Sequence, residues 1–313
     1  MVRPAIDPLK RHPGAQFAPM VVNRPSRRRR FPIRVAVFNA KGGAPLDQIV
    51  ARLREPPLAG ADIILLCEAG WRVRRSARRE FARELAEALG MSFAFGAVWG
   101  VPPRDGEPFS RFLGNAILSS EPLEEVRVVP MPRYPRRDFG RLRGAPNGVI
   151  ATVVIEGTPL TVTVAHLDSR AGPEFRARQM KLVAEAIPAG RPAIIGGDFN
   201  TTTIEIGVHQ VPIGVARALA LNRRRRHAPR SHEPLFDLLE ASGFDFEGAN
   251  VPGRPTFTFS RFIPHFLRPK LDWIALRDLD VVPGSAAVVA ACNGAWSPRF
   301  SDHDFVTCEI RPR

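Results

Sequence analysis

Apolar runs of strand length that end at polar residues are the feature that most constrains how this chain can fold. FPIRVAVFNA (31–40), ADIILLCEA (61–69) and RPAIIGGDFNTT (191–202) all have this form. Continuous apolar runs of this length are typical of strands buried on both faces of a sheet. In many sheet proteins the loops that follow such strands carry the ligand groups. The sequence therefore predicts a sheet protein whose functional side chains lie where strands end.

Further strands and several amphipathic helices fill the rest of the chain. We expect strands at 91–100, 114–120, 270–276 and 305–310, and a hairpin over 149–169 that turns at Glu156-Gly157. Helices are expected at 46–55, 76–90, 173–190 and 234–243. Because the strands are partly alternating and partly continuous, with helices between them, we expect an α/β or α+β protein. Its strands would form a mixed sheet or two packed sheets.

Positive charge is concentrated at the N-terminus. The net charge of +14 suggests a polyanionic partner. Residues 1–30 hold eight Lys or Arg against a single acid, Asp7, and are rich in Pro. We therefore expect residues 1–30 to form a disordered basic arm, followed by one catalytic domain over 31–313. A solvated arm and a binding arm are both open readings.

The chain carries no sign of membrane insertion or of a disulfide framework. No run reaches the roughly 18 apolar residues of a membrane span, and the N-terminus lacks the apolar core of a signal peptide. The three cysteines, Cys67, Cys292 and Cys308, are widely spaced and form no CxxC pair. We interpret them as structural thiols and expect a reducing, cytoplasmic setting.

Carboxylates, amides and histidines recur where the predicted strands stop, and together they predict a site for a hard cation. Each could alone be a turn residue, a cap or a core histidine. As a group they supply oxygen ligands for a divalent cation and imidazoles for proton transfer. HExxH and a Cys/His cluster are both absent, which disfavours zinc, and P-loop and GxSxG motifs are absent too. The residues concerned are Asn39, Glu68, His166, Asp168, Asp198, Asn200, Asp272, Asp302 and His303.

Seven short motifs resemble, in order, those of the endonuclease/exonuclease/phosphatase superfamily, the DNase I-like metal-dependent phosphoesterases. The resemblance covers roughly residues 33–312 and is most specific at GGDFNT and SDH. It implies an α+β four-layer sandwich, in which two packed mixed β-sheets are flanked by helices and the active site lies at one edge. The motifs are VFNAKGG, ILLCEAGWR, GNAILSS, VAHLDS, IIGGDFNTT, LDWIAL and SDHDFV.

The resemblance also implies a role for each candidate residue. Asp198 would activate the attacking water, and His303, oriented by Asp272, would contact the scissile phosphate. The implied metal ligands, for Mg²⁺ or Mn²⁺, are Asn39, Glu68 and Asp302. The implied catalytic residues are His166, Asp198, Asn200, Asp272 and His303. Arg72 and Asn115, which lie inside two of the motifs, are expected to bind substrate.

Two features of the chain bear on which branch it resembles. His166 stands where exonuclease III-type abasic-site nucleases usually carry a tyrosine, and it thus argues against that branch. Lys41 follows Asn39 by two residues, where some abasic-site nucleases carry an acid. Asp105 and Glu107 are candidate partners for His166.

We therefore expect a metal-dependent phosphodiesterase, nuclease-like, that hydrolyses a phosphate ester by in-line attack of water. The basic arm and the run Arg223, Arg224, Arg225 and Arg226 favour a nucleic acid as substrate. A sphingomyelinase-like or inositol-phosphate phosphoesterase is the alternative enzyme. A nucleic-acid-binding module without activity is the non-enzymatic alternative. The sequence leaves the oligomeric state open.

Overall fold

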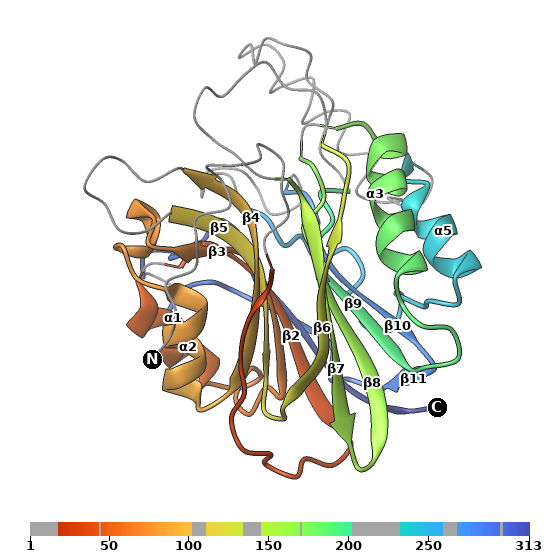
Figure 1. The fold of residues 1–313 in the computed structure, drawn as a ribbon, viewed down its shortest axis with the longest axis horizontal. Helices are drawn as coiled ribbons and strands as arrows, with labels where there is room; N and C mark the ends of the chain where they lie inside the picture. The colour runs from red at the N-terminus through yellow and green to blue at the C-terminus, as the bar shows by residue number, and fades with distance from the viewer. Residues whose placement is uncertain are drawn as a thin grey trace.

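Two β-sheets pack face to face, and helices cover the outer face of each (Figure 1). The computed structural model describes residues 18–43, 45–101, 111–133, 145–169, 171–201, 232–258, 268–294 and 297–313. Helices α1 and α2 lie on one outer face, and α3 and α5 lie on the other. The expected α+β four-layer sandwich is confirmed.

The first sheet is mixed and contains the two strands that carry Asn39 and Glu68. Its strand order is β1-β4-β5-β3-β2-β13-β11, with β12 also paired to β13. Strands β2 and β3 run parallel, and the other pairs are antiparallel. Its strands are β1 (Met20–Val22), β2 (Ile33–Gly42), β3 (Ile63–Trp71), β4 (Ser92–Val101), β5 (Arg111–Ser119), β11 (Leu279–Val281), β12 (Ala287–Val289) and β13 (Phe305–Pro312).

The second sheet, of order β10-β9-β8-β7-β6, carries Asp198 and Asp272. Strands β8 and β9 run parallel, and the expected hairpin joins β7 to β8 through Glu156 and Gly157, both of which have positive φ. Its strands are β6 (Leu123–Pro130), β7 (Asn147–Ile155), β8 (Thr158–Ala165), β9 (Ala193–Asp198) and β10 (Asp272–Arg277). The helices within the described residues are α1 (Leu46–Leu53), α2 (Phe81–Leu89), α3 (Pro173–Glu185), α5 (Leu235–Ala241) and the short 3₁₀ helix η2 (Arg74–Ser76).

The apolar runs are continuous because both faces of the central strands are covered. In β2, Val35 and Val37 face the second sheet, whereas Ala36 and Phe38 pack against the α1–α2 layer. This alternation follows from the two-residue period of a strand, which directs neighbouring side chains to opposite faces. A strand in such a position has no polar face, so the sequence shows a run instead of an alternating pattern.

Helix α2 begins later than the sequence predicts, at Phe81 instead of residue 76. The preceding residues fold back on β3: the backbone N–H of Arg72 donates to the Arg79 carbonyl, and Ala77 and Arg78 adopt positive φ. A left-handed residue cannot continue an α-helix, so the helix starts only after this turn. No helix in the described part of the chain is long and apolar enough to cross a membrane.

Residues 18–30 lie on the folded body, so the expectation of a disordered arm is wrong for this part of it. Strand β1 pairs with β4, and Asn23 exchanges hydrogen bonds with the backbone of Leu123. The guanidinium of Arg29 forms an ion pair with the buried Asp62 at 2.6 Å. Three-residue strands and backbone pairing to distant residues leave no periodic signal in the sequence. Residues 1–17 lie outside the described part, and the boundary at residue 31 stays a prediction.

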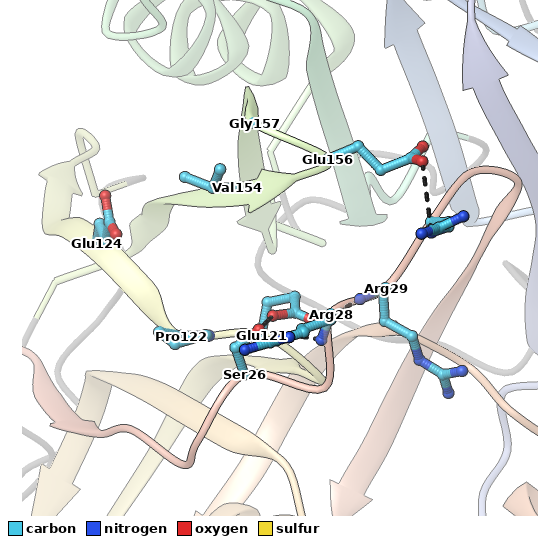
Figure 2. Close-up of a pocket in the computed structure, with 10 residues that line it drawn as sticks. Ser26, Arg28, Arg29, Glu121, Pro122, Glu124, Val154, Glu156 and Gly157 are labelled. Carbon is cyan, nitrogen blue, oxygen red and sulfur yellow. Dashed lines mark hydrogen bonds and ion pairs between the residues drawn. The ribbon is translucent and has the colours of Figure 1, made fainter.

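The same segment forms one side of a pocket of about 560 Å³, shown in Figure 2. The pocket lies at the end of the sandwich where β2 begins and where β7 turns into β8. Its lining carries charges of both signs, from Arg28, Arg29 and Arg30 and from Glu121, Glu124 and Glu156. Residues predicted to be functional are absent from this lining.

The two sheets approach each other closely at Gly196, which follows the apolar residues of β9. A Cβ atom at Gly196 would lie 2.6 Å from Leu65 Cδ1 and 2.7 Å from Val37 Cγ2, which both belong to the other sheet. At Gly197, with φ +146, a Cβ would lie 2.0 Å from the carbonyl oxygen of Ala165. The paired glycines thus allow the sheets and strands to approach just before Asp198.

We expect Gly196→Ala to lower the free energy of unfolding by about 1–3 kcal/mol, the usual cost of overpacking a core. Gly248→Ala is the matched control, because its new Cβ would meet only Val281 Cγ2 and Cβ, at 3.7 and 3.9 Å. The control should change stability by less than about 0.5 kcal/mol, as surface substitutions usually do. Urea denaturation of both variants measures the difference. Equal stabilities would contradict the close approach at Gly196.

Candidate active site

Antiparallel pairing brings two of the predicted catalytic carboxylates together. Asp198 is the last residue of β9 and Asp272 the first of β10, and the two are paired partners in the sheet. The loop before β13 supplies His303, and the ends of β2 and β8 supply Asn39 and His166. Five segments far apart in the sequence therefore converge at one edge of the sandwich, as the motif order implies.

Asp198 is the centre of the site and is buried. Its Oδ2 accepts a hydrogen bond of 2.9 Å from Asn39 Nδ2, and its Oδ1 accepts one of 3.1 Å from the backbone N–H of Asn200. The Nε2 atoms of His166 and His303 lie 3.5 and 3.6 Å from Oδ2. Burial raises the pKa of Asp198, although the two histidines and Asn39 act in the opposite direction.

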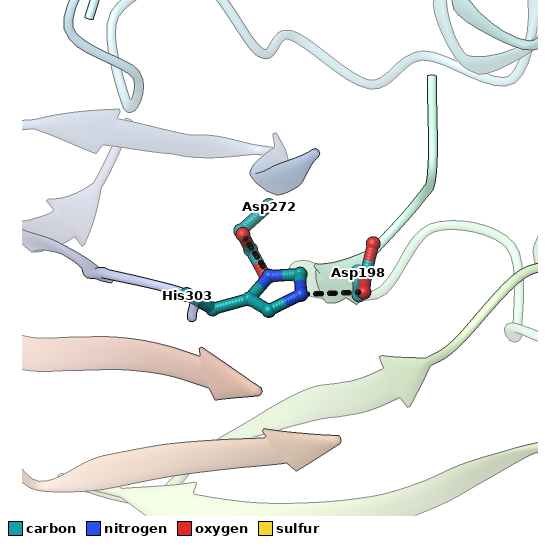
Figure 3. Close-up of side chains that lie close together, drawn as sticks. All are labelled: Asp198, Asp272 and His303. Atoms are coloured by element: carbon teal, nitrogen blue, oxygen red, sulfur yellow. Dashed lines mark hydrogen bonds and ion pairs between the residues drawn. The ribbon is translucent and has the colours of Figure 1, made fainter. Parts of the chain in front are cut away.

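His303 and Asp272 form a buried pair, shown with Asp198 in Figure 3. The ring Nδ1 lies 2.8 Å from Asp272 Oδ2. Burial opposes a charged imidazole, but the charges of Asp272 and Asp198 and the hydrogen bond to Asp272 outweigh it. They raise the pKa of His303 to about 10. The ring is therefore an imidazolium that lies between two carboxylates.

Residues that the sequence analysis did not single out hold this pair in place. The hydroxyl oxygen of Thr256 accepts hydrogen bonds from the backbone N–H groups of Leu271 and Asp272, at 2.9 and 3.0 Å. The ring of Phe257 packs edge-on against the His303 ring, with centroids 4.9 Å apart. Ser301 Oγ donates to the Asn39 carbonyl and accepts from the His303 N–H. The alternation of threonine and phenylalanine in PTFTFS was the sequence signal that could have indicated an extended segment here.

The loop that carries His166 is fixed by buried polar residues of α3. Gln179 accepts a hydrogen bond from the backbone N–H of Asp168 and donates one to the Pro132 carbonyl. Arg176, which has no exposed surface, donates to the Ala171 carbonyl and is paired with the equally buried Glu233. Asn200 also holds this loop, because its Nδ2 donates a hydrogen bond to the Leu167 carbonyl at 2.9 Å. Polar residues three apart on an otherwise apolar helix face were the sequence signal for Arg176 and Gln179.

Glu68 and Lys41 occupy matching irregularities in β3 and β2. Both have positive φ, 50° and 48°, and the β2–β3 register shifts between Asn39 and Gly42. The register of β3 on β5 shifts across Glu68 as well, between Leu66 and Ala69. Bulges of this kind re-aim side chains next to active sites. Lys41 Nζ lies 2.6 Å from Asp302 Oδ2, so one of the predicted metal ligands carries an ammonium partner.

The donors at this edge suit a hard cation only in part. Asn39 and Glu68 offer oxygen atoms at adjacent strand ends, which is the donor type that Mg²⁺ prefers. Among described residues, Asp198, Asp272 and His303 are the group of potential ligands that lies within 4.8 Å of one another. Because His303 is already paired with Asp272 and its pKa is raised to about 10, this group is poorly suited to hold a cation. Asp302 is the predicted ligand that fits least, since Lys41 neutralises it.

The residues predicted to bind substrate lie in different surroundings. Arg72 Nε donates to Glu80 Oε1 at 2.7 Å, within the turn before α2. Asn115 is buried in β5, and its Nδ2 donates to the Asn147 carbonyl at 2.7 Å. Their roles stay predictions. Arg223, Arg224, Arg225 and Arg226, together with Asp105 and Glu107, lie outside the described residues.

The cysteine interpretation is confirmed for two of the three thiols. Cys67 and Cys308 are buried, and all three cysteines are free. Burial and the nearby Asp198 charge raise the pKa of Cys67 well above its usual value, so this thiol stays protonated. Its Sγ accepts from the Asp198 N–H at 3.4 Å and lies 3.6 Å from the Ala165 carbonyl oxygen. Cys67 is thus a packing residue beneath the site.

The charge state of His303 gives a test that needs no substrate. With the pKa raised to about 10, the ring should remain protonated up to pH 9 and lose its proton only as the pH rises through 10. Asp272→Asn removes the negative charge that contributes most to the stability of the imidazolium, so the pKa of His303 should fall. NMR titration of the histidine ring signals in EDTA-treated protein measures both values. A titration midpoint near 6.5 in the wild type would contradict the buried ion pair.

Comparison with known proteins agrees with this geometry. The sequence profile of the Endonuclease/Exonuclease/phosphatase family matches residues 36–303. A comparison with curated proteins gives no match. Solved structures with the same fold include an endonuclease/exonuclease/phosphatase from Beutenbergia cavernae DSM 12333 (TM-score 0.60, 21% identity, covering 91% of this chain and 72% of that one). Another is the human Nocturnin catalytic domain with bound sulfate (TM-score 0.58, 18% identity, covering 94% and 98%).

D. rerio TDP2 complexed with a single-strand DNA product has the fold too (TM-score 0.54, 16% identity, covering 90% of this chain and 99% of that one). Identities this low show the fold alone. The family profile, in contrast, spans most of the chain and includes Asn39, Asp198 and His303. This chain therefore belongs to the endonuclease/exonuclease/phosphatase family.

Proposed function

We propose that the protein is a divalent-metal-dependent phosphoric ester hydrolase, most simply a nuclease-like phosphodiesterase. The observation that carries the proposal is the convergence of His166 and His303 on a single buried oxygen of Asp198, at 3.5 and 3.6 Å. A buried carboxylate beside an imidazolium provides a base and an acid within one small site. Membership of the family supports hydrolysis of a phosphate ester.

In this mechanism Asp198 accepts the proton of the attacking water. The raised pKa of Asp198 makes it a stronger base than an exposed aspartate. Asn39 and the Asn200 N–H hold the carboxylate in place. His303 donates hydrogen bonds to the phosphate oxygens as negative charge grows on them, and Asp272 keeps it protonated and oriented.

The proposed cofactor is Mg²⁺ or Mn²⁺, which Glu68 and Asn39 would hold. When bound, the ion offsets the charge of the phosphate oxygens and of the leaving alkoxide. Glu68 lies at a bulge where its side chain is turned relative to the regular strand. Asp302, the third predicted ligand, is paired with Lys41.

A nucleic acid is the proposed substrate class. Supporting it are the net charge of +14 and the run Arg223–Arg226, which follows the Asp198 strand in sequence. The TDP2 structure with its DNA product shows that this fold can accommodate a strand of DNA. A sphingomyelinase-like or inositol-phosphate phosphoesterase uses the same chemistry and remains the second candidate. A reducing, cytoplasmic location is proposed from the free cysteines.

The deciding experiment is a hydrolysis screen with Mg²⁺ or Mn²⁺ against DNA, RNA, sphingomyelin and inositol phosphates. Wild type should cleave one class, and Asp198→Asn should lose about 10²–10⁴-fold in rate, the usual weight of a general base. Asp280→Asn is the matched control. It makes the same change at a partly exposed aspartate of β11, whose side chain pairs with Arg313. Full activity in excess EDTA, or in Asp198→Asn, would refute the mechanism.

His303 and Asp272 should act as one catalytic unit. If Asp272 works only through His303, the double change His303→Ala/Asp272→Ala should be scarcely slower than His303→Ala alone. Comparison of kcat/KM for the two single variants, the double variant and wild type completes the cycle. Circular dichroism confirms that each variant is folded. Losses that multiply fully would show that the two residues act independently.

A further inference from the structure

Lys41 has a backbone conformation that residues other than glycine seldom adopt. Its φ of 48° lies in the left-handed region, two residues after Asn39 and directly before Gly42 and Gly43, which also have positive φ. The backbone N–H of Lys41 donates to Asn39 Oδ1 at 3.1 Å, so the conformation is tied to a site residue. Unfavourable backbone conformations of this kind concentrate at functional sites.

This conformation allows Lys41 to meet Asp302 across 261 residues of sequence. The Nζ–Oδ2 distance is 2.6 Å, and the two side chains are 40% and 26% exposed. Both partners are fixed to the same place, because Ser301 Oγ donates to the Asn39 carbonyl at 2.8 Å. An ordinary surface ion pair joins two flexible side chains whose backbones are not linked by such hydrogen bonds.

The pair changes the charge available to a metal. Asp302 adjoins His303 and is the carboxylate expected on the metal side of the site. With an ammonium at hydrogen-bond distance, its negative charge is already offset. A divalent ion that used Asp302 as a ligand would have to displace Lys41 or lie against a like charge. Asn39 and Glu68, on the neighbouring strands β2 and β3, are the ligands that the proposed function assigns to the ion.

We propose that Lys41 is a resident cation that withholds Asp302 from the metal, so that the site holds one divalent ion on the Asn39–Glu68 side. This inference rests on the metal site of the proposed function. It makes Lys41 a positioning residue: it sets how many ions bind and how tightly, without taking part in proton transfer. The charge that a second ion would bring to the Asp302 side is supplied by the lysine.

Mn²⁺ binding to the full chain, measured by calorimetry and by electron paramagnetic resonance, tests the proposal without a substrate. Wild type should bind one ion. Lys41→Met, which keeps the side-chain length but not the charge, should bind a second ion or bind the first at least about tenfold more tightly, the scale on which residues around a metal alter its affinity. Lys41→Arg keeps the charge and is the matched control, and it should bind as wild type does. Lys41→Gln provides a second neutral variant if Lys41→Met is poorly folded.

Asp302→Asn identifies the carboxylate responsible. In Lys41→Met, where Asp302 has lost its ammonium partner, this change should abolish the gain in Mn²⁺ binding. Unchanged binding in both neutral variants would overturn the proposal, as would a gain in Mn²⁺ binding that persists in the double variant Lys41→Met/Asp302→Asn. So would the absence of Mn²⁺ binding from wild type and neutral variants alike. Because no hydrolysis is measured, failure of the substrate screen cannot be mistaken for failure of this inference.

Discussion

The hydrogen bond from Asn39 to Asp198 joins the two sheets at the site, and the rest of the arrangement depends on it. Asn39 lies near the end of β2 in one sheet, and Asp198 ends β9 in the other. The bond is possible only because Gly196 and Gly197 remove the side chains that would hold β9 away from Val37, Leu65 and Ala165. The chemistry of the site thus depends on packing. The two glycines allow the sheets to approach each other, and this approach buries the Asp198 carboxylate.

Burial then assigns opposite roles to neighbouring groups. Desolvation raises the pKa of Asp198 and would lower that of His303, but His303 faces two carboxylates and is held protonated instead. Loss of the His303 proton would leave Asp198 and Asp272 as two anions in one buried site, which is costly. The imidazolium is therefore the counter-ion of the site, and in the proposed function it also serves as the acid. One low-dielectric environment produces both a basic carboxylate and an acidic ring.

The sequence was sufficient where a signal is local. Buried strands show as apolar runs, so β2, β3 and β9 and the residues at their ends, Asn39 and Asp198 among them, could be placed without coordinates. Contacts between distant segments leave no such trace. Strand β1 pairs with β4, which is remote from it in sequence. Thr256 and Gln179 likewise form hydrogen bonds to site segments that are not their sequence neighbours. The short strands β11 and β12 were missed for the same reason, since three residues cannot display a period.

The position of each site residue in its strand determines whether its side chain can be redirected without moving the strands. The carboxylates and histidines lie at strand ends inside a packed sandwich, where a shift of one residue would turn a side chain to the opposite face. Lys41 and Glu68 sit in bulges, which can re-aim a side chain without moving the strands. A change of one bulge residue can therefore alter the charge beside Asn39 and Asp302 while the Asp198–His303–Asp272 geometry persists. In the proposed function, the groups that transfer protons are therefore placed by the sheets, whereas the charges beside the metal are placed by the bulges and can vary separately.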